Sequence, residues 1–311
     1  MGFGSSIEDF FQDLLSGVLQ KSLSGAYDVI TDSVGLLEGK ISETPQQFGG
    51  GGVFTALKAI SDAAILPIGI GIMAIIICYD LITACIDSNN MKDFDTAIFF
   101  KFIIKAFVAI YLLNNVFSLC GSIFQLGANV AGVAFNALFK NSNGNSFITS
   151  GTSESLINKS TGELLKSDEF KNILSELDVS DLFLSCFLST IVYIISLAVM
   201  IIVLVVVSGR MIEILIYFCA APIPFGTLTN KEWSNVGFSY IKNIFALALQ
   251  GVFIVITLAI YVVLFNANVT NIAADYKSMT GALFNWICYS VVCCFMLLKT
   301  GSISKSILGA H

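Results

Sequence analysis

Charge is scarce in this chain, and it is missing in long runs. Only 12% of the residues are charged, whereas about 25% are charged in an ordinary soluble domain. Residues 182–209, 243–274 and 278–298 contain no Asp, Glu, Lys or Arg, and neither do residues 63–79 and 106–139. Roughly 20 apolar residues of helix are enough to cross a hydrocarbon core. These runs predict a protein that crosses a membrane several times.

Groups that carry out catalysis are also scarce. The only histidine is His311, which excludes His-based triads and HExxH metal sites from the apolar runs. The sequence has no Walker loop, and Gly69-Ile-Gly71 resembles a dinucleotide fingerprint but falls within an apolar run instead of after a strand. We therefore expect no enzymatic activity, no cofactor and no metal, and any ATP use must belong to a partner.

The cysteine pattern and the net charge argue against two further kinds of site, paired-cysteine motifs and basic nucleic-acid-binding surfaces. The eight cysteines lie in or beside apolar stretches, and no two of them form a CxxC pair. We interpret them as small apolar fillers. The net charge of −6 is unlike the basic surfaces that grip nucleic acids through their phosphates.

What the chain does contain is long apolar segments without the alternation of barrel strands, at a mean hydropathy of +0.84. This pattern predicts an all-α, polytopic membrane protein, because only helices and closed barrels satisfy the backbone inside lipid. We expect about five transmembrane helices. Their ranges are about 60–86, from Phe99 onward, 182–209, 243–266 and 279–299.

The second of these spans poses a problem of length. A straight helix over 101–139 would be about 58 Å long, which is too long for one crossing. We therefore expect a break near Asn114–Asn115 or at Gly121. The remainder, 123–139, would then form an interfacial or oligomer-facing helix.

Four regions organise the chain. Residues 1–52 form an extracytoplasmic amphipathic segment, in which 6–38 read as one helix or two. Residues 53–139 hold the first two spans and the interfacial helix, and 140–181 form an acidic extracytoplasmic insert. Residues 182–311 form the C-terminal membrane core. The amphipathic segment can lie among lipid headgroups or pack on protein, and its acidity favours protein.

The most specific stretch is residues 210–242, which we call the elbow. It begins with Arg210 and Glu213, continues through Pro222 and Pro224, and reaches Trp233 before the next span. The two prolines end a helix at the membrane face and predict a re-entrant or interfacial hairpin. Arg210 and Glu213 are spaced to form an ion pair, which would serve as a headgroup-level anchor, as a gate or as a contact between subunits.

This arrangement resembles the TrbL-like family of polytopic inner-membrane subunits of type IV secretion and conjugation machines. In that family a long hydrophobic helix leads to an Ala-x-x-Pro turn, an amphipathic segment with a Trp, and another span. The resemblance covers roughly 180–300. The Lys-rich and Phe-rich composition favours the branch found in Gram-positive conjugative elements.

The resemblance implies a channel or scaffold subunit that helps single-stranded DNA with its attached relaxase to cross the cell membrane. Its implied partners are secretion ATPases, a coupling protein and an envelope-facing assembly factor. We expect the elbow to dock the ATPase or coupling protein and the acidic insert to meet the envelope-facing factor.

Two further patterns concern assembly and orientation. Small residues at helical spacing predict close helix packing and a ring-like homo-oligomer; they are Gly127, Ala131 and Ala134, and Ala246 and Gly251 beside Gln250.

If 211–230 does not cross the bilayer, eight Lys and Arg lie near span ends on one side and four on the other. The positive-inside rule then places the N-terminus outside and the C-terminus in the cytoplasm.

The sequence leaves two alternative function classes. A stand-alone transporter or channel for ions or small molecules would be favoured by inverted repeats, and the first two and last two spans share no motif. A membrane-bound enzyme is disfavoured by the missing histidine and the lack of clustered carboxylates.

Overall fold

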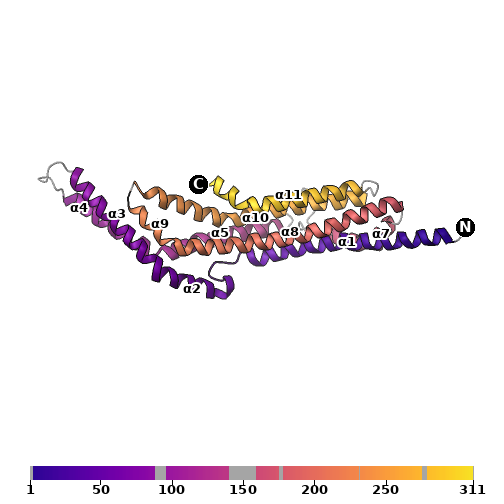
Figure 1. Cartoon of the computed structure of the whole chain (residues 1–311), viewed down its shortest axis with the longest axis horizontal. Coiled ribbons are helices and arrows are strands. Elements are labelled where there is room, and N and C mark those ends of the chain that lie inside the picture. Colours follow the sequence, from indigo (N-terminus) through magenta and orange to yellow (C-terminus); the bar gives the residue numbers. More distant parts are fainter. Residues whose placement is uncertain are drawn as a thin grey trace. The chain divides into compact units, whose positions relative to one another are not determined.

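The computed structural model describes residues 3–87, 96–139, 159–174, 178–230, 232–274 and 279–310. Helix is the only regular secondary structure within these ranges. Five helical segments are long and apolar enough to cross a membrane. They are Phe48–Thr83, Val116–Phe139, Val179–Ala220, Ser234–Ile272 and Met279–Ile307. The prediction of an all-α, polytopic membrane protein is confirmed (Figure 1).

The described helices contribute to two compact units, which are considered separately. Unit 1 contains residues 1–41, 131–207 and 252–300, and unit 2 contains 42–130, 208–251 and 301–311. Four helices run through both sets of residues. They are α5 (Val116–Phe139), α8 (Val179–Ala220), α10 (Ser234–Ala274) and α11 (Met279–Ile307).

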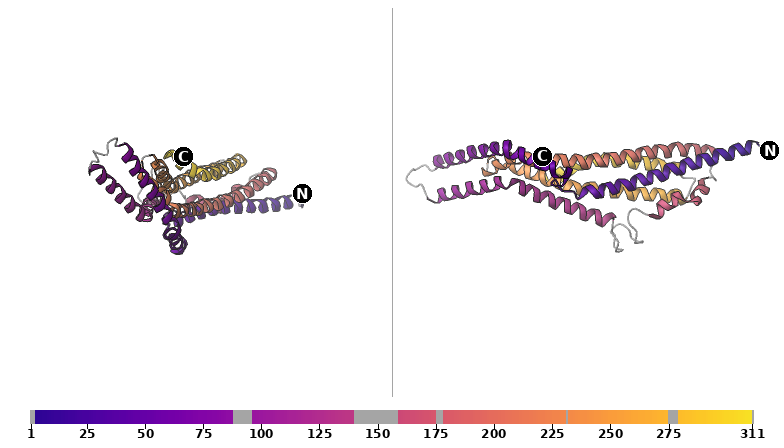
Figure 2. Two further views of the ribbon diagram at one scale, coloured as in Figure 1. Left: turned by 60° about the vertical axis from the view of Figure 1, so that its left-hand side comes forward. Right: turned by 90° about the horizontal axis from the view of Figure 1, so that it is seen from below.

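Unit 1 is built on α1 (Phe3–Ile41), a single helix that lies alongside α8 in both figures of the ribbon (Figures 1 and 2). From Leu19 onward its apolar face is buried in the core of the unit. The ring of Tyr27 in α1 packs at a tilt on Phe265 of α10, and Phe265 contacts Trp286 of α11 edge-on. The amphipathic segment thus packs on its own chain over most of its length. Its first turns keep Phe10, Phe11, Leu14 and Val18 exposed.

The described part of the insert packs against α1. Helices α6 (Lys159–Lys166) and α7 (Asp168–Leu174) are tied to α1 by two ion pairs, Lys166 with Asp28 and Lys171 with Asp13, both at 2.8 Å. The hydrogen bond and charge of Asp13 raise the pKa of Lys171. The rest of the insert, residues 140–158 and 175–177, lies outside the described residues. An envelope-facing partner for the insert stays a prediction.

Unit 2 begins with a glycine turn. Gly49, Gly50 and Gly51 have φ values of 62°, 72° and 80° in the short helix η1 (Phe48–Gly51), a left-handed region in which side chains are strained. The chain then continues without interruption through α2 (Gly52–Ile60), a π-helical turn η2 (Ser61–Ile65) and α3 (Leu66–Asp87). The π turn ends two residues before Pro67, and a proline inside a helix removes one backbone hydrogen bond.

The predicted helix break falls at Asn115. Helix α4 (Thr96–Asn114) ends there and α5 begins at Val116. The Asn115 side-chain amide donates to the Tyr111 carbonyl at 2.9 Å, which competes with the backbone for that acceptor. Helix α5 therefore begins before the expected remainder, 123–139, and the interfacial placement of that remainder stays a prediction. The whole of α5 is long and apolar enough to cross a membrane, and Phe102–Asn114 of α4 is a shorter apolar stretch.

The third and fourth helices are also longer than expected. Helix α8 continues through Gly209 and Arg210 to Ala220, a length of about 63 Å at 1.5 Å per residue. A Cβ at Gly209 would meet no neighbouring atom, so that glycine does not mark a boundary. The break comes only where Pro222 removes a backbone donor, in α9 (Pro222–Gly226) and the 3₁₀ turn η3 (Thr227–Thr229).

The C-terminal Lys-bearing segment is helical instead of a separate tail. Helix α11 extends to Ile307, and Gly309 closes it with a φ of 58°. The Ala310 amide donates back to the Lys305 carbonyl at 2.9 Å, as in a left-handed helix cap. This extension places Ser304 and Lys305 on a rigid element.

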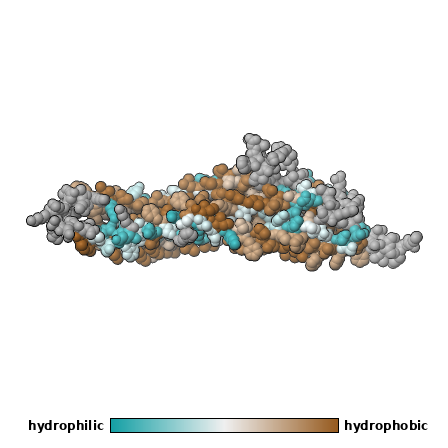
Figure 3. All heavy atoms as spheres, turned by 90° about the horizontal axis from the view of Figure 1, so that it is seen from above, coloured by the Kyte–Doolittle hydropathy of each residue, from teal (hydrophilic) through white to brown (hydrophobic). Residues whose placement is uncertain are grey.

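Many apolar side chains remain on the surface of both units. Brown apolar residues cover much of the face in Figure 3, with hydrophilic patches among them. Ile75, Phe107, Phe187 and Ile201 are each at least 60% exposed. Such surfaces are stable against lipid and unfavourable in water.

Candidate functional site

The first candidate site is a buried polar cluster around Arg210, the only arginine of the chain. Arg210 is 4% exposed. Its Nε donates to the Leu247 carbonyl at 3.1 Å and its Nη2 donates to the Ala248 carbonyl at 3.3 Å. The planar guanidinium fork suits two neighbouring acceptors. Arg210 therefore links α8 to α10 by hydrogen bonds to the α10 backbone.

Two glycines allow the helices to come this close. A Cβ at Gly251 would lie 2.5 Å from Nη1 of Arg210, and a Cβ at Gly127 of α5 would lie 2.5 Å from the Ala248 carbonyl oxygen. Both distances are far below van der Waals contact. Gly127 and Gly251 thus permit the packing of α5, α8 and α10 at one level.

Helix α11 joins the same cluster through its C-terminal turns. Ser304 donates a hydrogen bond to the Ala246 carbonyl, and Gly301 faces the side chain of Gln250. Three consecutive carbonyls of α10, at residues 246, 247 and 248, therefore accept hydrogen bonds from neighbouring helices. We call this set the carbonyl cluster.

The predicted ion pair between Arg210 and Glu213 is wrong. Glu213 instead pairs with Lys305 of α11 at 3.2 Å, and both side chains are more than a third exposed. Arg210 is buried against the α10 backbone, whereas the Glu213 side chain is partly exposed. No sequence pattern indicated the pairing with Lys305, because the residues after the last apolar run were expected to form a tail.

Most of the small-residue candidates serve packing within the chain. Gly127, Ala246, Gln250 and Gly251 all contribute to the carbonyl cluster, whereas Ala131 and Ala134 belong to the core of unit 1. Self-association through these residues stays a prediction. Ser304 was not among the predicted packing residues, although Gly301 and Ser304 are small residues at helical spacing, like the predicted ones.

The second candidate site is the proline-bent part of the elbow. Pro222 and Pro224 are buried, and a Cβ at Gly69 of α3 would lie 2.6 Å from the Pro222 carbonyl oxygen. The end of α8 is held by Ser61, which donates to the Cys219 carbonyl at 2.9 Å. The hydroxyl of Tyr240 in α10 donates to the Tyr217 carbonyl, with the two rings stacked at 5.3 Å. The elbow is thus a packed structural corner.

A polar node fixes the far end of this corner. The Asp80 carboxylate of α3 pairs with Lys105 of α4 and accepts a hydrogen bond from the Asn230 side-chain amide. Asn230 is 4% exposed, and its Oδ1 accepts the backbone N–H of Glu232 at 2.6 Å.

Trp233 lies beside a groove in the same region. The groove has a volume of about 430 Å³ and is lined by Ile72, Ile75, Ile76 and Tyr79 of α3 together with Glu232 and Trp233. Trp233 is 54% exposed. Its apolar ring and indole N–H suit the boundary between lipid and water or a protein contact.

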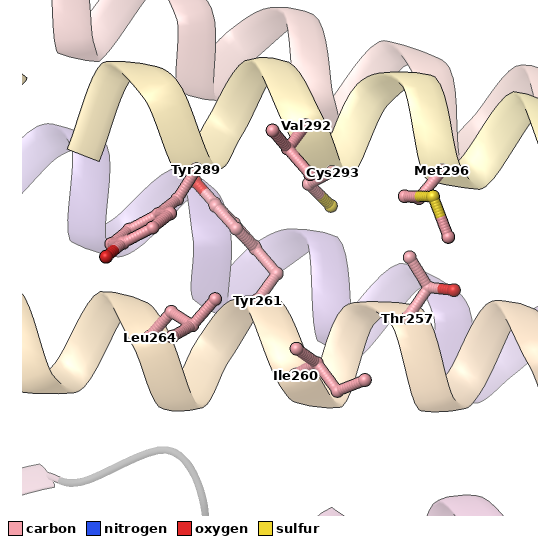
Figure 4. Close-up of a pocket in the computed structure, with 8 residues that line it drawn as sticks. All are labelled: Thr257, Ile260, Tyr261, Leu264, Tyr289, Val292, Cys293 and Met296. Atoms are coloured by element: carbon pink, nitrogen blue, oxygen red, sulfur yellow. The ribbon is translucent and has the colours of Figure 1, made fainter. Parts of the chain in front are cut away.

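Unit 1 has a pocket of a different kind. Figure 4 shows it between α10 and α11, lined by Tyr261 and Leu264 from one helix and Tyr289 and Cys293 from the other. Its volume is about 150 Å³, and the Tyr261 hydroxyl is hydrogen-bonded to Ser290 at 2.9 Å. The pocket offers apolar contact and no cluster of groups suited to catalysis.

Comparison with known families decides the kind of protein. Residues 30–222 match the family described as TrbL/VirB6 plasmid conjugal transfer like protein. The chain belongs to this family. The match covers more than half of the sequence and confirms the resemblance to TrbL-like proteins. Its range differs from the expected 180–300, because it begins at residue 30 and ends at residue 222. No curated protein and no solved structure matches the chain significantly.

The TrbL/VirB6 match also shows which part of the chain carries the family relationship. It includes α3, α4, α5 and all of α8, and it ends at Pro222. Arg210 and Glu213 lie inside the match and Trp233 lies outside it. The protein is a component of a conjugal transfer system, and assignment to the Gram-positive branch stays a prediction.

Proposed function

We propose that this TrbL/VirB6-like protein is a channel or scaffold subunit of a conjugative type IV secretion system. In this role it helps single-stranded DNA with its attached relaxase to cross the cell membrane. The observation that carries the proposal is the family match across the membrane helices. The physical character of the chain supports it, since long apolar helices fastened by buried polar contacts suit a rigid passage.

The proposal includes assembly and orientation. Several copies would form a ring-like homo-oligomer in the plasma membrane, with the N-terminus outside and the C-terminus in the cytoplasm. The excess of Lys and Arg at one set of span ends supports this orientation. The secretion ATPases and the coupling protein would dock at the elbow, and the insert would meet an envelope-facing assembly factor.

The packing of the elbow supports its proposed role as a docking site. Pro222 packs backbone to backbone on Gly69, so the corner cannot shift without disturbing α3. Trp233 stands at the exposed end of the same corner. A partner that contacts Trp233 would therefore be coupled mechanically to the membrane helices.

The test is conjugation in a strain that lacks the chromosomal or plasmid copy of the gene. We expect Pro222→Ala combined with Pro224→Ala to abolish transfer while the protein still accumulates in the membrane. The reason is that restored backbone donors favour a straighter helix. Unchanged mating frequency in this variant would refute the elbow assignment.

A second measurement tests passage of DNA directly. Cells are cross-linked with formaldehyde during mating, the tagged protein is purified, and the transferred strand is amplified. We expect recovery of the strand with the wild-type protein and none when the relaxase is inactive. Purified protein that instead forms an ion-coupled carrier in liposomes, without DNA recovery, would support the stand-alone transporter.

A further inference from the structure

We infer that Asp80 is a positioning residue that sets the placement of Trp233 at the elbow. Asp80 joins three segments, since its carboxylate contacts Lys105 of α4 and Asn230 at the end of η3 while its own backbone belongs to α3. The inference rests on the proposed docking role of the elbow and adds the device that holds its contact residue.

The first step is the way Asn230 uses both ends of its side chain. Its Nδ2 donates to Asp80, and its Oδ1 accepts the N–H of Glu232 at 2.6 Å. The second contact closes a tight side-chain turn of the kind that Asn favours. Asn230 itself is extended, with φ −114° and ψ 140°. The Asn230 side chain therefore fixes the position of the Glu232 backbone relative to η3.

The second step is the position of Trp233. It follows Glu232 directly and precedes α10, which begins at Ser234. One wall of the groove beside it is α3, through Ile72, Ile76 and Tyr79. Asp80 is the next residue on that helix. The node thus connects the wall of the groove to the short segment that carries Trp233.

The third step is the environment of the node. The Asp80 side chain is 18% exposed and Asn230 is 4% exposed, so water competes weakly for their hydrogen bond. Lys105, at 41% exposed, balances the charge that would otherwise be costly among apolar helices. Removing the carboxylate leaves the Asn230 amide without this partner in a buried place.

The experiment reads the position of Trp233 from its own fluorescence. The chain has two tryptophans, Trp233 and Trp286. In a Trp286→Phe background the signal reports Trp233 alone, in protein reconstituted into phosphatidylcholine vesicles. Quenching by acrylamide and the emission maximum are measured for each variant.

We expect Asp80→Leu and Asn230→Asp each to increase quenching and to move the emission to longer wavelength. Lys105→Met should have a smaller effect, because the Asp80–Asn230 hydrogen bond remains. The matched control is Asp62→Asn, which changes an exposed acid in the same continuous helical segment. It should leave the fluorescence unchanged.

A swap separates positioning from general loss of structure. In the double variant Asp80→Asn with Asn230→Asp, the amide at position 80 donates to the carboxylate at 230, which still accepts from the Glu232 N–H. We expect this pair to restore the wild-type quenching. The inference is overturned if the single variants quench like wild type, or if the swap quenches like the worse single variant.

Conjugation measured in parallel distinguishes the two proposals. Node variants that alter the fluorescence but transfer DNA normally would uphold the positioning role and refute docking at the elbow. If Trp233→Ala stops transfer while the node variants change neither readout, docking stands and the positioning role is refuted.

Discussion

The two units differ in how they use polar groups. In the described part of unit 1, two ion pairs lie outside the apolar core, between α1 and the small helices α6 and α7, and their side chains are exposed. In unit 2 a guanidinium and a carboxylate are drawn into the packed region, at Arg210 and Asp80. Surface pairs contribute little to stability, whereas buried polar contacts demand particular partners. Unit 2 is therefore the part in which single polar substitutions should matter most.

The strongest test of this difference uses matched glycines. Gly127→Ala in unit 2 places a Cβ 2.5 Å from a backbone carbonyl and should destabilise the protein by about 3 kcal/mol. Gly35→Ala in α1 meets no neighbour and should stabilise it by about 1 kcal/mol through helix propensity. Thermal unfolding of the detergent-purified protein measures both, and equal effects would contradict the close packing at Gly127.

The next effect concerns the guanidinium fork. Arg210→Lys keeps the charge buried but cannot reach both α10 carbonyls in the same geometry, and we expect a loss of about 1–3 kcal/mol. Arg210→Met removes the charge and should recover most of that stability, because a buried ion is often replaced by an apolar side chain without cost. The two variants are compared by chemical denaturation. A lysine variant as stable as wild type would show that the two hydrogen bonds from Arg210 to α10 do not stabilise the protein.

A smaller effect is expected for the pair that replaces the predicted one. Glu213→Lys or Lys305→Glu should each destabilise unit 2 by about 0.5 kcal/mol, and the two together should restore it. The small size follows from the exposure of both side chains. A double-mutant cycle with no coupling between 213 and 305 would show that the 3.2 Å contact is not populated.

The smallest effect belongs to the exposed pair of unit 1. Asp13 raises the pKa of Lys171, so the contribution of the pair is complete below the ordinary pKa of lysine and is lost as pH rises through the raised value. Between neutral pH and pH 9 we expect no change in the contact of α7 with α1. NMR titration of isotopically methylated lysines should show the Lys171 pKa falling toward its ordinary value in Asp13→Asn.

The sequence by itself determined the class of this protein. Runs such as 182–209 carry no charge, and a backbone in lipid must close its hydrogen bonds internally, so helices and several crossings followed. Even the kink at Asn115 was predictable, because the uncharged run exceeds one bilayer and contains two adjacent asparagines. The proline pair at 222 and 224 likewise predicted a break, although the helix before it is longer than the apolar run alone indicated.

Tertiary structure alone decided which polar groups meet. The i, i+3 spacing of Arg210 and Glu213 favoured a local pair, but the partners of Arg210 are carbonyls 37 and 38 residues away, and Glu213 meets Lys305. Asp80, Lys105 and Asn230 share no motif, since they lie on separate segments. Local sequence sets the helices and their ends, whereas the partners of a buried charge depend on which helix backbones come close enough, and here Gly127 and Gly251 decide that.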